Sequence, residues 1–354
     1  MPMAYGLKVS KRFGERAIKV VTQLTLINRD LKIRDLEDSL VIPLTRTPSK
    51  EEGEKLKEAL CACECVWDSF PKRVRAVKSL VEALENDLPR DLLSYLPKSM
   101  DIVGSVAIVD ISPEIEAWKQ RVGSAVLQVN RNVETVLAKA GLVQGKHRLR
   151  RFEVIAGTGE TKVVHREYGC TYQLDPTEAY FTPRLSEERR RVAEQVREGE
   201  TIVDMFASVG PFAIQIGKTR ENITVYAVDV NERAYYFLTQ NVKANGVEKT
   251  VIPVFGDIRV LVERFAGVSD RAILDLPEKA SEFIDVACRL LKPGGGMMHY
   301  YCFQSEPSVL EKAEKRLRGN VAEANRTLQD VVYKRRLRQV APRRWHVVLD
   351  AIVR

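Results

Sequence analysis

Three acidic residues stand at the ends of three apolar segments in the second half of the chain. Asp204 closes TIVD, Asp229 closes TVYAVD and Asp257 follows VIPVF. Each segment is typical of a buried strand, and Gly210 with Pro211 after the first one predicts a tight turn leading into a helix. In a doubly wound α/β sheet the carboxyl ends of parallel strands meet at one ligand crevice. The three carboxylates would therefore line a pocket that suits a neutral or cationic ligand.

The first turn separates two classes of nucleotide ligand. A pyrophosphate dinucleotide needs several glycines there, so that backbone amides can approach its phosphates, and no G-x-G-x-x-G follows this strand. An acidic turn repels phosphate and suits the amino group and sulfonium of S-adenosylmethionine, with Asp229 on the ribose and Asp257 near the adenine amine. The alternative, a similar sheet whose carboxylates only cap helices, is disfavoured because the acids recur in register. The cofactor-binding residues that we expect are Asp204, Phe206, Ala207, Ser208, Val209, Gly210, Asp229, Val230, Asp257, Ile258, Asp275 and Pro277.

A second group of residues could hold an acceptor for alkylation. Asp275, Leu276 and Pro277 end the strand-like segment RAILDLP, where such a sheet presents the group that holds a nucleophile against the cofactor. Pro277 would fix this turn, since its ring locks φ. A plain strand-to-helix turn capped by Asp275 explains these residues equally well.

Arginines and aromatic residues gather between residues 148 and 189. Guanidinium groups bind phosphates and base edges, and aromatic rings stack on an extruded base. Glu188, one helical turn beyond Arg184, would serve as a general base if its pocket is desolvated. A salt-bridged surface helix explains the same composition, and that alternative stays open. The substrate contacts that we expect come from Tyr180, Phe181, Arg184, Leu276 and Pro277.

The elements that must position these residues alternate regularly after residue 183. The pattern predicts helices at 187–196, 231–246, 279–291 and 306–320, between strands that end in the acidic residues. Two final strands joined at Pro342 would form an antiparallel hairpin that closes the sheet edge. The fold class is therefore α/β, with a doubly wound, Rossmann-like sheet in residues 183–354.

Two smaller regions precede this sheet. Residues 1–70 predict a small α/β module with a strand and an amphipathic helix in 7–27 and another strand in 40–46. Residues 71–182 predict an α+β domain that binds RNA. Its elements would be a buried strand at 102–111, a helix from Pro113 to Gly141, and antiparallel strands at 147–157 and 161–175.

The bulk properties favour a globular protein with an anionic partner. The 354 residues are 45% hydrophobic and 29% charged, and the net charge of +8 favours a polyanion such as nucleic acid. Cys61, Cys63 and Cys65 have no second Cys pair or nearby His, so we expect small buried thiols and no metal. Because no N-terminal apolar segment is present, we expect a cytoplasmic chain without membrane association.

Four separated segments together resemble a known family. LKVSKRFGERAIKVV, YFTPRLSEERRR, VDMFASVGPFAI and DLPEKASEFID are similar to stretches of the archaeal and eukaryotic tRNA (guanine-37-N1)-methyltransferases, and the resemblance spans nearly the whole chain. It implies a class I, S-adenosylmethionine-dependent methyltransferase domain that grips the anticodon stem-loop together with the middle domain. The N-terminal module would recognise the tRNA outer corner. Guanosine 37 would be flipped out of its loop, and we expect a monomer.

The resemblance also implies roles for single residues. Glu188 falls on the family's acceptor of the N1 proton, and Tyr180 falls on a tyrosine near the target base. The family's catalytic arginine falls on Arg148 or Arg150, where it would stabilise negative charge on guanine O6.

Two positions depart from the family pattern. Ser208 stands where Gly is usual, and Asp275 replaces the Asn of an Asn-Leu-Pro motif. An ionised Asp only accepts hydrogen bonds, so Asp275 would accept from guanine N1–H or N2–H and could share the base role with Glu188. Methylation of a tricyclic wyosine precursor stays open for the same reason.

Two rival functions remain. The related aminocarboxypropyl transferase of wyosine synthesis shares fold and cofactor, but GPF at 210–212 and the intact Glu188 region favour methyl transfer. A non-catalytic RNA-binding protein with a decayed site is disfavoured by the intact Asp204, Asp229 and Asp257.

Overall fold

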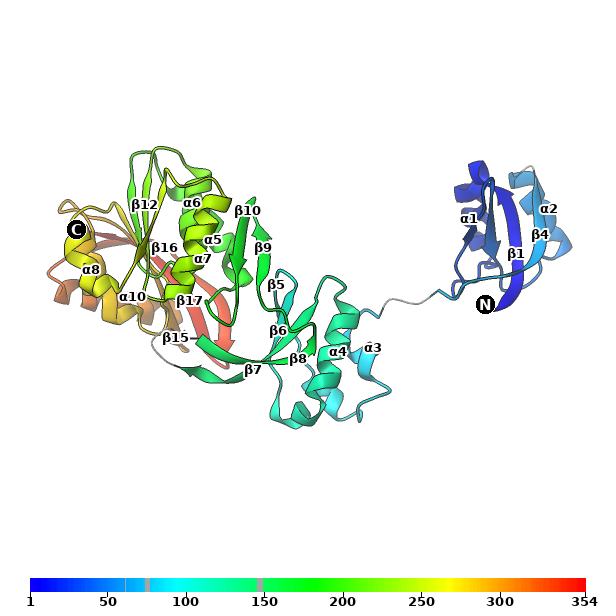
Figure 1. Ribbon diagram of the computed structural model, residues 1–354, viewed down its shortest axis with the longest axis horizontal. Helices are drawn as coiled ribbons and strands as arrows, with labels where there is room; N and C mark the ends of the chain where they lie inside the picture. Colours follow the sequence, from blue (N-terminus) through cyan, green and yellow to red (C-terminus); the bar gives the residue numbers. More distant parts are fainter. Residues whose placement is uncertain (61, 74–76, 145–148) are drawn as a thin grey trace. The chain divides into compact units, whose positions relative to one another are not determined.

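The chain folds into two compact units, Met1–Lys78 and Ser79–Arg354, which we describe one at a time (Figure 1). The computed structural model describes residues 1–60, 62–73, 77–144 and 149–354. The domain boundaries expected at residues 70 and 182 stay predictions. Among the described residues, no helix is both long and apolar enough to span a membrane.

The first unit is an antiparallel sheet packed against two helices. Ala17 and Val21 of the first helix are buried together with Leu7 of the sheet and Leu56 of the second helix, as the amphipathic pattern predicts. The strand order is β2-β3-β1-β4. The elements are β1 (Met3–Ser10), α1 (Gly14–Gln23), β2 (Arg34–Asp35), β3 (Ser39–Pro43), α2 (Lys50–Leu60) and β4 (Cys63–Ser69).

The cysteines of this unit differ from the expectation of small buried thiols. Cys63 is half-buried and Cys65 is exposed, so the prediction is wrong for Cys65. The physical reason is that β4 is an edge strand of a small sheet, and only one of its faces is covered. Cys61 lies outside the described residues.

The second unit contains a seven-stranded sheet in the order β13-β12-β11-β14-β15-β17-β16. Its first five strands run parallel, whereas β17 is antiparallel to both β15 and β16. The doubly wound sheet and its closing hairpin are therefore confirmed. The strands are β11 (Thr201–Asp204), β12 (Thr224–Asp229), β13 (Val251–Phe255), β14 (Arg271–Leu274), β15 (Gly296–Ser305), β16 (Leu328–Ala341) and β17 (Arg344–Val353).

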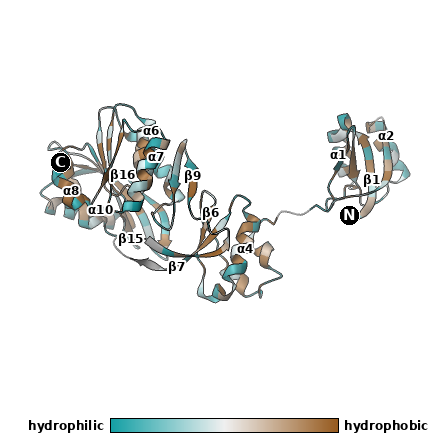
Figure 2. Ribbon diagram, in the orientation of Figure 1, coloured by the Kyte–Doolittle hydropathy of each residue, from teal (hydrophilic) through white to brown (hydrophobic). Residues whose placement is uncertain are grey.

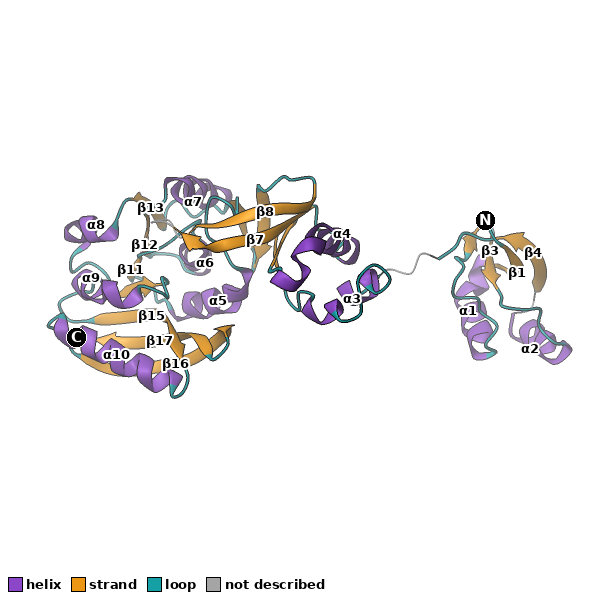
Figure 3. Ribbon diagram, turned by 90° about the horizontal axis from the view of Figure 1, so that it is seen from below, coloured by secondary structure: helices purple, strands orange, loops and turns teal. Residues whose placement is uncertain are grey.

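Helices cover both faces of this sheet because alternate strand residues point to opposite sides (Figure 3). Ile202 and Tyr301 pack in the core with α5, α6 and α7, whereas Val203 and Tyr300 pack with α8, α9 and α10. Hydrophobic and hydrophilic residues mix on the covering helices, as expected when one helix face is buried (Figure 2). These helices are α5 (Ser186–Gln195), α6 (Pro211–Thr219), α7 (Glu232–Ala244), α8 (Ile258–Phe265), α9 (Ile284–Leu290) and α10 (Val309–Glu323).

A smaller sheet and a hairpin precede the large sheet. The smaller sheet has the order β5-β6-β7-β8, and Val122 and Val126 of α4 pack against it. The hairpin consists of β9 and β10. The elements are α3 (Leu80–Leu84), β5 (Asp101–Val103), β6 (Val106–Val109), α4 (Lys119–Val129), β7 (Thr135–Gln144), β8 (Leu149–Gly157), β9 (Val163–Glu167) and β10 (Cys170–Leu174).

Two predictions for this region are wrong. The segment 102–111 is not one strand but two, because Gly104 adopts a left-handed φ of +57° and turns the chain between β5 and β6. The helical segment that starts at Pro113 ends at Val129 and not at Gly141, since Thr135 and the residues after it pair in parallel with β6. The β-branched Thr135 and Val136 favour this strand.

Two asparagines fasten the β9–β10 hairpin to α7. The Asn241 side chain accepts from the Gln173 N–H at 2.7 Å and donates to the Gln173 carbonyl at 3.0 Å. Asn245 makes the same pair of bonds with Thr171, at 2.9 and 2.7 Å. Each side chain thereby replaces the partner that an edge strand lacks. The segment after the hairpin is consequently held close to the carboxyl edge of the large sheet.

Candidate cofactor and acceptor site

Three carboxylates meet at the carboxyl edge of the large sheet. Asp204 ends β11, Asp229 ends β12 and Asp275 follows β14. Asp204 is 1% exposed; its Oδ1 accepts from the Phe206 N–H at 3.4 Å, and its Oδ2 has no hydrogen-bond partner among the described residues. Burial, and then the charges of Asp275 and Asp229, raise the pKa of Asp204 to about 8. This cluster is therefore suited to a cationic group.

Backbone donors fix the orientation of Asp229. Its Oδ2 accepts from the Ser208 N–H at 2.7 Å and its Oδ1 accepts from the Asn231 N–H at 2.8 Å. Its carbonyl accepts from the Gly256 N–H at 2.9 Å, which connects the ends of β12 and β13. The half-buried carboxylate is thus held at the first turn before any ligand binds.

The first turn depends on two left-handed residues. Gly210, at φ +92°, precedes Pro211 at the start of α6, and a Cβ there would lie 2.5 Å from Leu238 Cδ1. Ser208 also has a positive φ of +48°, which explains why Gly is usual at this position. The Ser208 hydroxyl donates to the Tyr180 carbonyl at 2.6 Å. Ser208 therefore links the first turn to the segment that precedes α5.

Most of the other predicted cofactor residues already have protein partners or belong to the buried core. Asp257 caps α8 by accepting from the Arg259 N–H at 3.0 Å and pairs with the Arg259 guanidinium at 2.8 Å. Phe206 packs edge-on against Phe283 at 4.9 Å between ring centroids. Val230 is half-buried. The residues that belong to the buried core are Ala207, Val209 and Ile258.

The predicted acceptor turn is held against β15. Asp275, Leu276 and Pro277 are all half-buried. The Pro277 carbonyl accepts from the Phe303 N–H at 3.1 Å, and Leu274, the residue before Asp275, pairs with Tyr300. Asp275 is therefore presented at the same edge as Asp204 and Asp229, as the sequence predicts.

Glu188 lies in the first turn of α5 and is only 5% exposed. Its Oε1 accepts from the Tyr301 hydroxyl at 2.7 Å and from Arg191 Nη2 at 2.6 Å, and its Oε2 accepts from Arg191 Nε at 2.9 Å. Arg191 also pairs with Asp350 at 2.6 Å. Burial, and next the charge of Glu188, raise the pKa of Tyr301 well above its ordinary value, so this residue is a neutral donor.

Sequence reasoning missed the partners of Glu188. Tyr301 lies 113 residues after Glu188 in the sequence. Asp350, the partner of Arg191, lies 159 residues after that arginine. Asp350 is completely buried and also accepts from His299 Nδ1 at 2.8 Å. The one sequence signal was an Asp inside the apolar segment VVLDAIV, which a buried ion pair explains.

The predicted substrate residues do not all face solvent. Tyr180 is 53% exposed, whereas Phe181 is 7% exposed and packs between His165 and Tyr172. Arg184 forms an ion pair with Asp101 of β5. Substrate contacts by Phe181 and Arg184 therefore stay predictions. Of the two candidate catalytic arginines, Arg148 lies outside the described residues, and Arg150 is in β8 with its side chain outside the described part.

The strand order, the reversed β17 and the acidic cluster at the carboxyl edge define a class I methyltransferase domain. Comparison with known families agrees: residues 163–329 match the TRM5/TYW2 methyltransferase domain, residues 80–161 the TYW2 N-terminal domain, and residues 6–52 the tRNA methyltransferase 5 N-terminal domain. The chain belongs to the archaeal and eukaryotic tRNA (guanine-37-N1)-methyltransferase family.

Individual relatives support this assignment. The chain is 33% identical to the tRNA (guanine(37)-N(1))-methyltransferase Trm5b of Pyrococcus abyssi, over 98% of both chains. It is also 33% identical to a tRNA(Phe) (4-demethylwyosine(37)-C(7)) aminocarboxypropyltransferase of Methanocaldococcus jannaschii, over 62% of this chain and 85% of that protein.

Among solved structures, the complex of aTrm5 with tRNALeu is similar with a TM-score of 0.80 and 28% identity, over 99% of both chains. M. jannaschii TYW2 in complex with AdoMet is similar with a TM-score of 0.56 and 29% identity, over 72% of this chain and 99% of that one.

Proposed function

We propose that the protein transfers a methyl group from S-adenosylmethionine to N1 of guanosine 37 in the anticodon loop of tRNA. The observation that carries the proposal is the acidic cluster at the sheet edge, in which the buried Asp204 carboxyl stands beside Asp229 and the acceptor turn. The full-length likeness to a tRNA (guanine(37)-N(1))-methyltransferase supports the same substrate.

The residues at the first turn fit a cationic adenosine derivative. The fixed Asp229 carboxylate supplies negative charge that would repel a pyrophosphate. The buried Asp204, whose Oδ2 has no hydrogen-bond partner among the described residues, would ionise when a cation binds beside it. Asp204 would hold the cationic methionine end and Asp229 the ribose hydroxyls. When bound, S-adenosylmethionine supplies a methyl group activated by its sulfonium. An AdoMet complex of a structural relative supports this choice of cofactor.

On the acceptor side, Glu188 would take the proton from guanine N1. Its low exposure and its bonds to Tyr301 and Arg191 exclude bulk water and fix the carboxylate. The exposed Tyr180 ring would stack near the flipped base. Asp275 would accept a hydrogen bond from the base, and Arg148 or Arg150 would stabilise the charge that develops on O6.

The whole tRNA would contact more than one part of the protein. The anticodon stem-loop would bind the second unit, and the outer corner would bind the first unit, which matches the tRNA methyltransferase 5 N-terminal domain. The net charge of +8 suits this polyanion. We further propose that the enzyme is a monomer and acts in the cytoplasm, where it would meet its tRNA substrate.

Product mass on a treated tRNA transcript tests the reaction. We expect a gain of one methyl group at nucleotide 37, located on guanine N1 by nuclease digestion. A gain of one aminocarboxypropyl group would favour the rival transferase, to which this chain is similar over part of its length. Methylation of a tricyclic precursor in a parallel assay would show a second substrate. Absence of labelled cofactor binding would favour a non-catalytic RNA-binding protein.

A further inference from the structure

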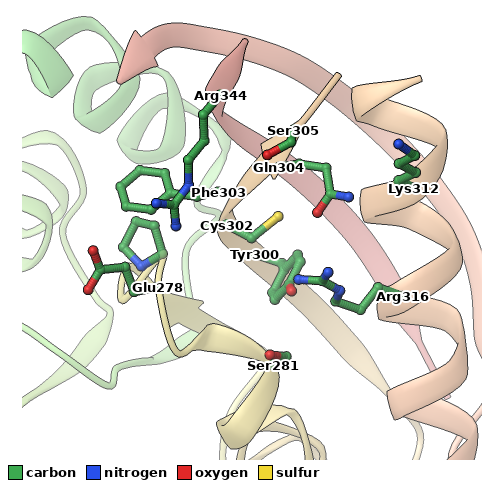
Figure 4. A pocket seen from close by; sticks show the side chains of 11 residues that line it. Glu278, Ser281, Tyr300, Cys302, Phe303, Gln304, Ser305, Lys312, Arg316 and Arg344 are labelled. Atoms are coloured by element: carbon green, nitrogen blue, oxygen red, sulfur yellow. The ribbon is translucent and has the colours of Figure 1, made fainter. Parts of the chain in front are cut away.

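A pocket of about 420 Å³ lies directly beside the acceptor turn (Figure 4). Its walls come from the turn after β14, the end of β15, α10 and the start of β17. Tyr300 and Cys302 place it on the α10 side of the sheet, whereas Tyr301 contacts Glu188 on the α5 side. The volume is within the range of ligand sites, and no residue of the catalytic proposal other than Pro277 lines it.

The charge of this pocket is predominantly positive. Lys312, Arg316 and Arg344 line it together with a single carboxylate, Glu278. Lys312 and Arg316 are four residues apart on α10 and therefore point to the same side. The Arg344 guanidinium lies over the Phe303 ring at 5.1 Å from its centroid. Cations from two elements therefore line one cavity.

The three cations also lack the partners that their neighbours have. Arg318 and Lys334 both pair with Glu314, at 3.4 and 2.9 Å. In the described part of the chain, Lys312, Arg316 and Arg344 make no ion pair with a carboxylate. Converging cations repel one another, and this repulsion is relieved when an anion binds. The pocket is therefore organised for a negatively charged group.

A buried hydroxyl adds a second donor group. Tyr300 is fully buried, and its Oη has no hydrogen-bond partner among the described residues. The guanidinium of Arg316 lies next to the Tyr300 ring (Figure 4). Burial raises the pKa of the neighbouring Cys302 thiol to about 11, so this thiol is neutral and does not act as a nucleophile. These neutral and cationic groups suit an anionic ligand.

We propose that this pocket binds a phosphodiester group of the RNA strand, next to the base that is methylated. The proposal rests on the proposed function, which supplies the RNA. A phosphodiester carries one charge and several acceptor oxygens, which match guanidinium, ammonium and hydroxyl donors. Pro277 lines the pocket two residues after Asp275, and its carbonyl is fixed to Phe303. A base at Asp275 therefore has its own strand beside the pocket.

The test compares two full-length variants with opposite expectations. K312A/R316A removes the α10 cations of the pocket, and Lys315→Ala removes an exposed cation of the same helix that does not line it. For the double variant, we expect the Kd for tRNA to rise about tenfold and the slope of log Kd against log salt to fall by about one to two. Lys315→Ala should change the Kd less than about threefold. Cofactor affinity, which also reports correct folding, should equal that of the wild type in both.

Each other result overturns the proposal. An unchanged Kd for tRNA and an unchanged salt slope in the double variant would show that the pocket does not contact the RNA. An equal rise in Kd in Lys315→Ala would show that the loss of affinity comes from the lowered net charge and not from the pocket. Titration of the wild type with inorganic phosphate tests for a site that binds only small anions. If phosphate binds to the wild type and the double variant loses phosphate binding but keeps its tRNA affinity, the RNA strand is excluded as the ligand. Product analysis runs in parallel. If the wild type forms no N1-methylguanosine, the proposed function fails; if it does while affinity is unchanged in the variant, only the pocket assignment fails.

Discussion

The Ser208 hydroxyl donates a 2.6 Å hydrogen bond to the carbonyl of Tyr180. This bond joins the turn expected to hold the cofactor to the segment expected to receive the base, although the two residues are 28 positions apart. Ser208 makes it from a left-handed conformation that a residue with a side chain rarely adopts. Compared with glycine, the serine is strained in this backbone conformation, but its hydroxyl connects the two halves of the site.

Two substitutions at Ser208 separate these effects. Ser208→Gly relieves the left-handed strain but loses the bond, so we expect a change in unfolding free energy within about 1 kcal/mol. Ser208→Ala keeps the strain and loses the bond, and should destabilise the protein by about 1 kcal/mol. Both should slow single-turnover methylation several-fold, because Tyr180 is less well fixed, with little change in cofactor affinity. A wild-type rate in both variants would show that the bond does not position Tyr180.

Asp204→Asn should weaken cofactor binding and yet stabilise the ligand-free protein against unfolding. The folded protein keeps the Asp204 proton up to about pH 8, whereas the usual pKa is 3.8, so the folded state loses stability as pH rises from about 4 to 8. The gain in melting temperature of Asp204→Asn over the wild type should therefore grow across this range and level off above pH 8. We expect at least a tenfold loss of cofactor affinity in calorimetry. Asp285→Asn, exposed on α9, is the control, and a gain that does not depend on pH would contradict the assignment.

Glu188→Gln should lower turnover by about 100-fold or more, since general base catalysis contributes on that order. The tRNA affinity should change little, because the side chain is buried. Tyr301→Phe removes one hydrogen bond to this carboxylate and should slow single turnover by about tenfold with unchanged cofactor affinity. Glu187→Gln, exposed on the same helix turn, is the control. Wild-type single-turnover rates in Glu188→Gln would exclude it as the base.

Removal of residues 1–78 should weaken tRNA binding by about tenfold or more and leave cofactor binding intact, because loss of one of two linked contacts removes their mutual reinforcement. The acidic cluster lies entirely in the second unit. Filter binding with tRNA and calorimetry with the cofactor measure the two affinities. Loss of cofactor affinity in the shortened chain would contradict an independent first unit.

Sequence patterns predicted the large sheet well because its strands are short and apolar and several of them end at an acidic residue and a turn. Asp204, Asp229 and Asp275 lie at one edge, since parallel strands share one carboxyl edge. Asp257, the third strand-end acid expected there, pairs with Arg259 at the start of α8. The helix predicted to reach Gly141 failed for a different reason. Apolar residues from Thr135 onward fit helical spacing, but pairing with β6 on one side and β8 on the other decides their conformation.

The surroundings of Glu188 were beyond sequence reasoning. Its position in the YFTPRLSEERRR segment singles it out, but the partners that orient it come from β15 and, through Arg191, from β17. Pairs separated by more than a hundred residues leave no local pattern. Ser208 is similar: its left-handed conformation and its bond to Tyr180 follow from the turn and not from the residue type.

The position of β17 has a consequence for how the enzyme is made. This strand is synthesised after β15 and β16, yet it inserts between them. Until it does so, Asp350 cannot hold Arg191, and α5 lacks one of its long-range contacts. A nascent chain can therefore assemble strands β11 to β14 while the surroundings of Glu188 are still incomplete, and these surroundings form fully only when β17 has inserted.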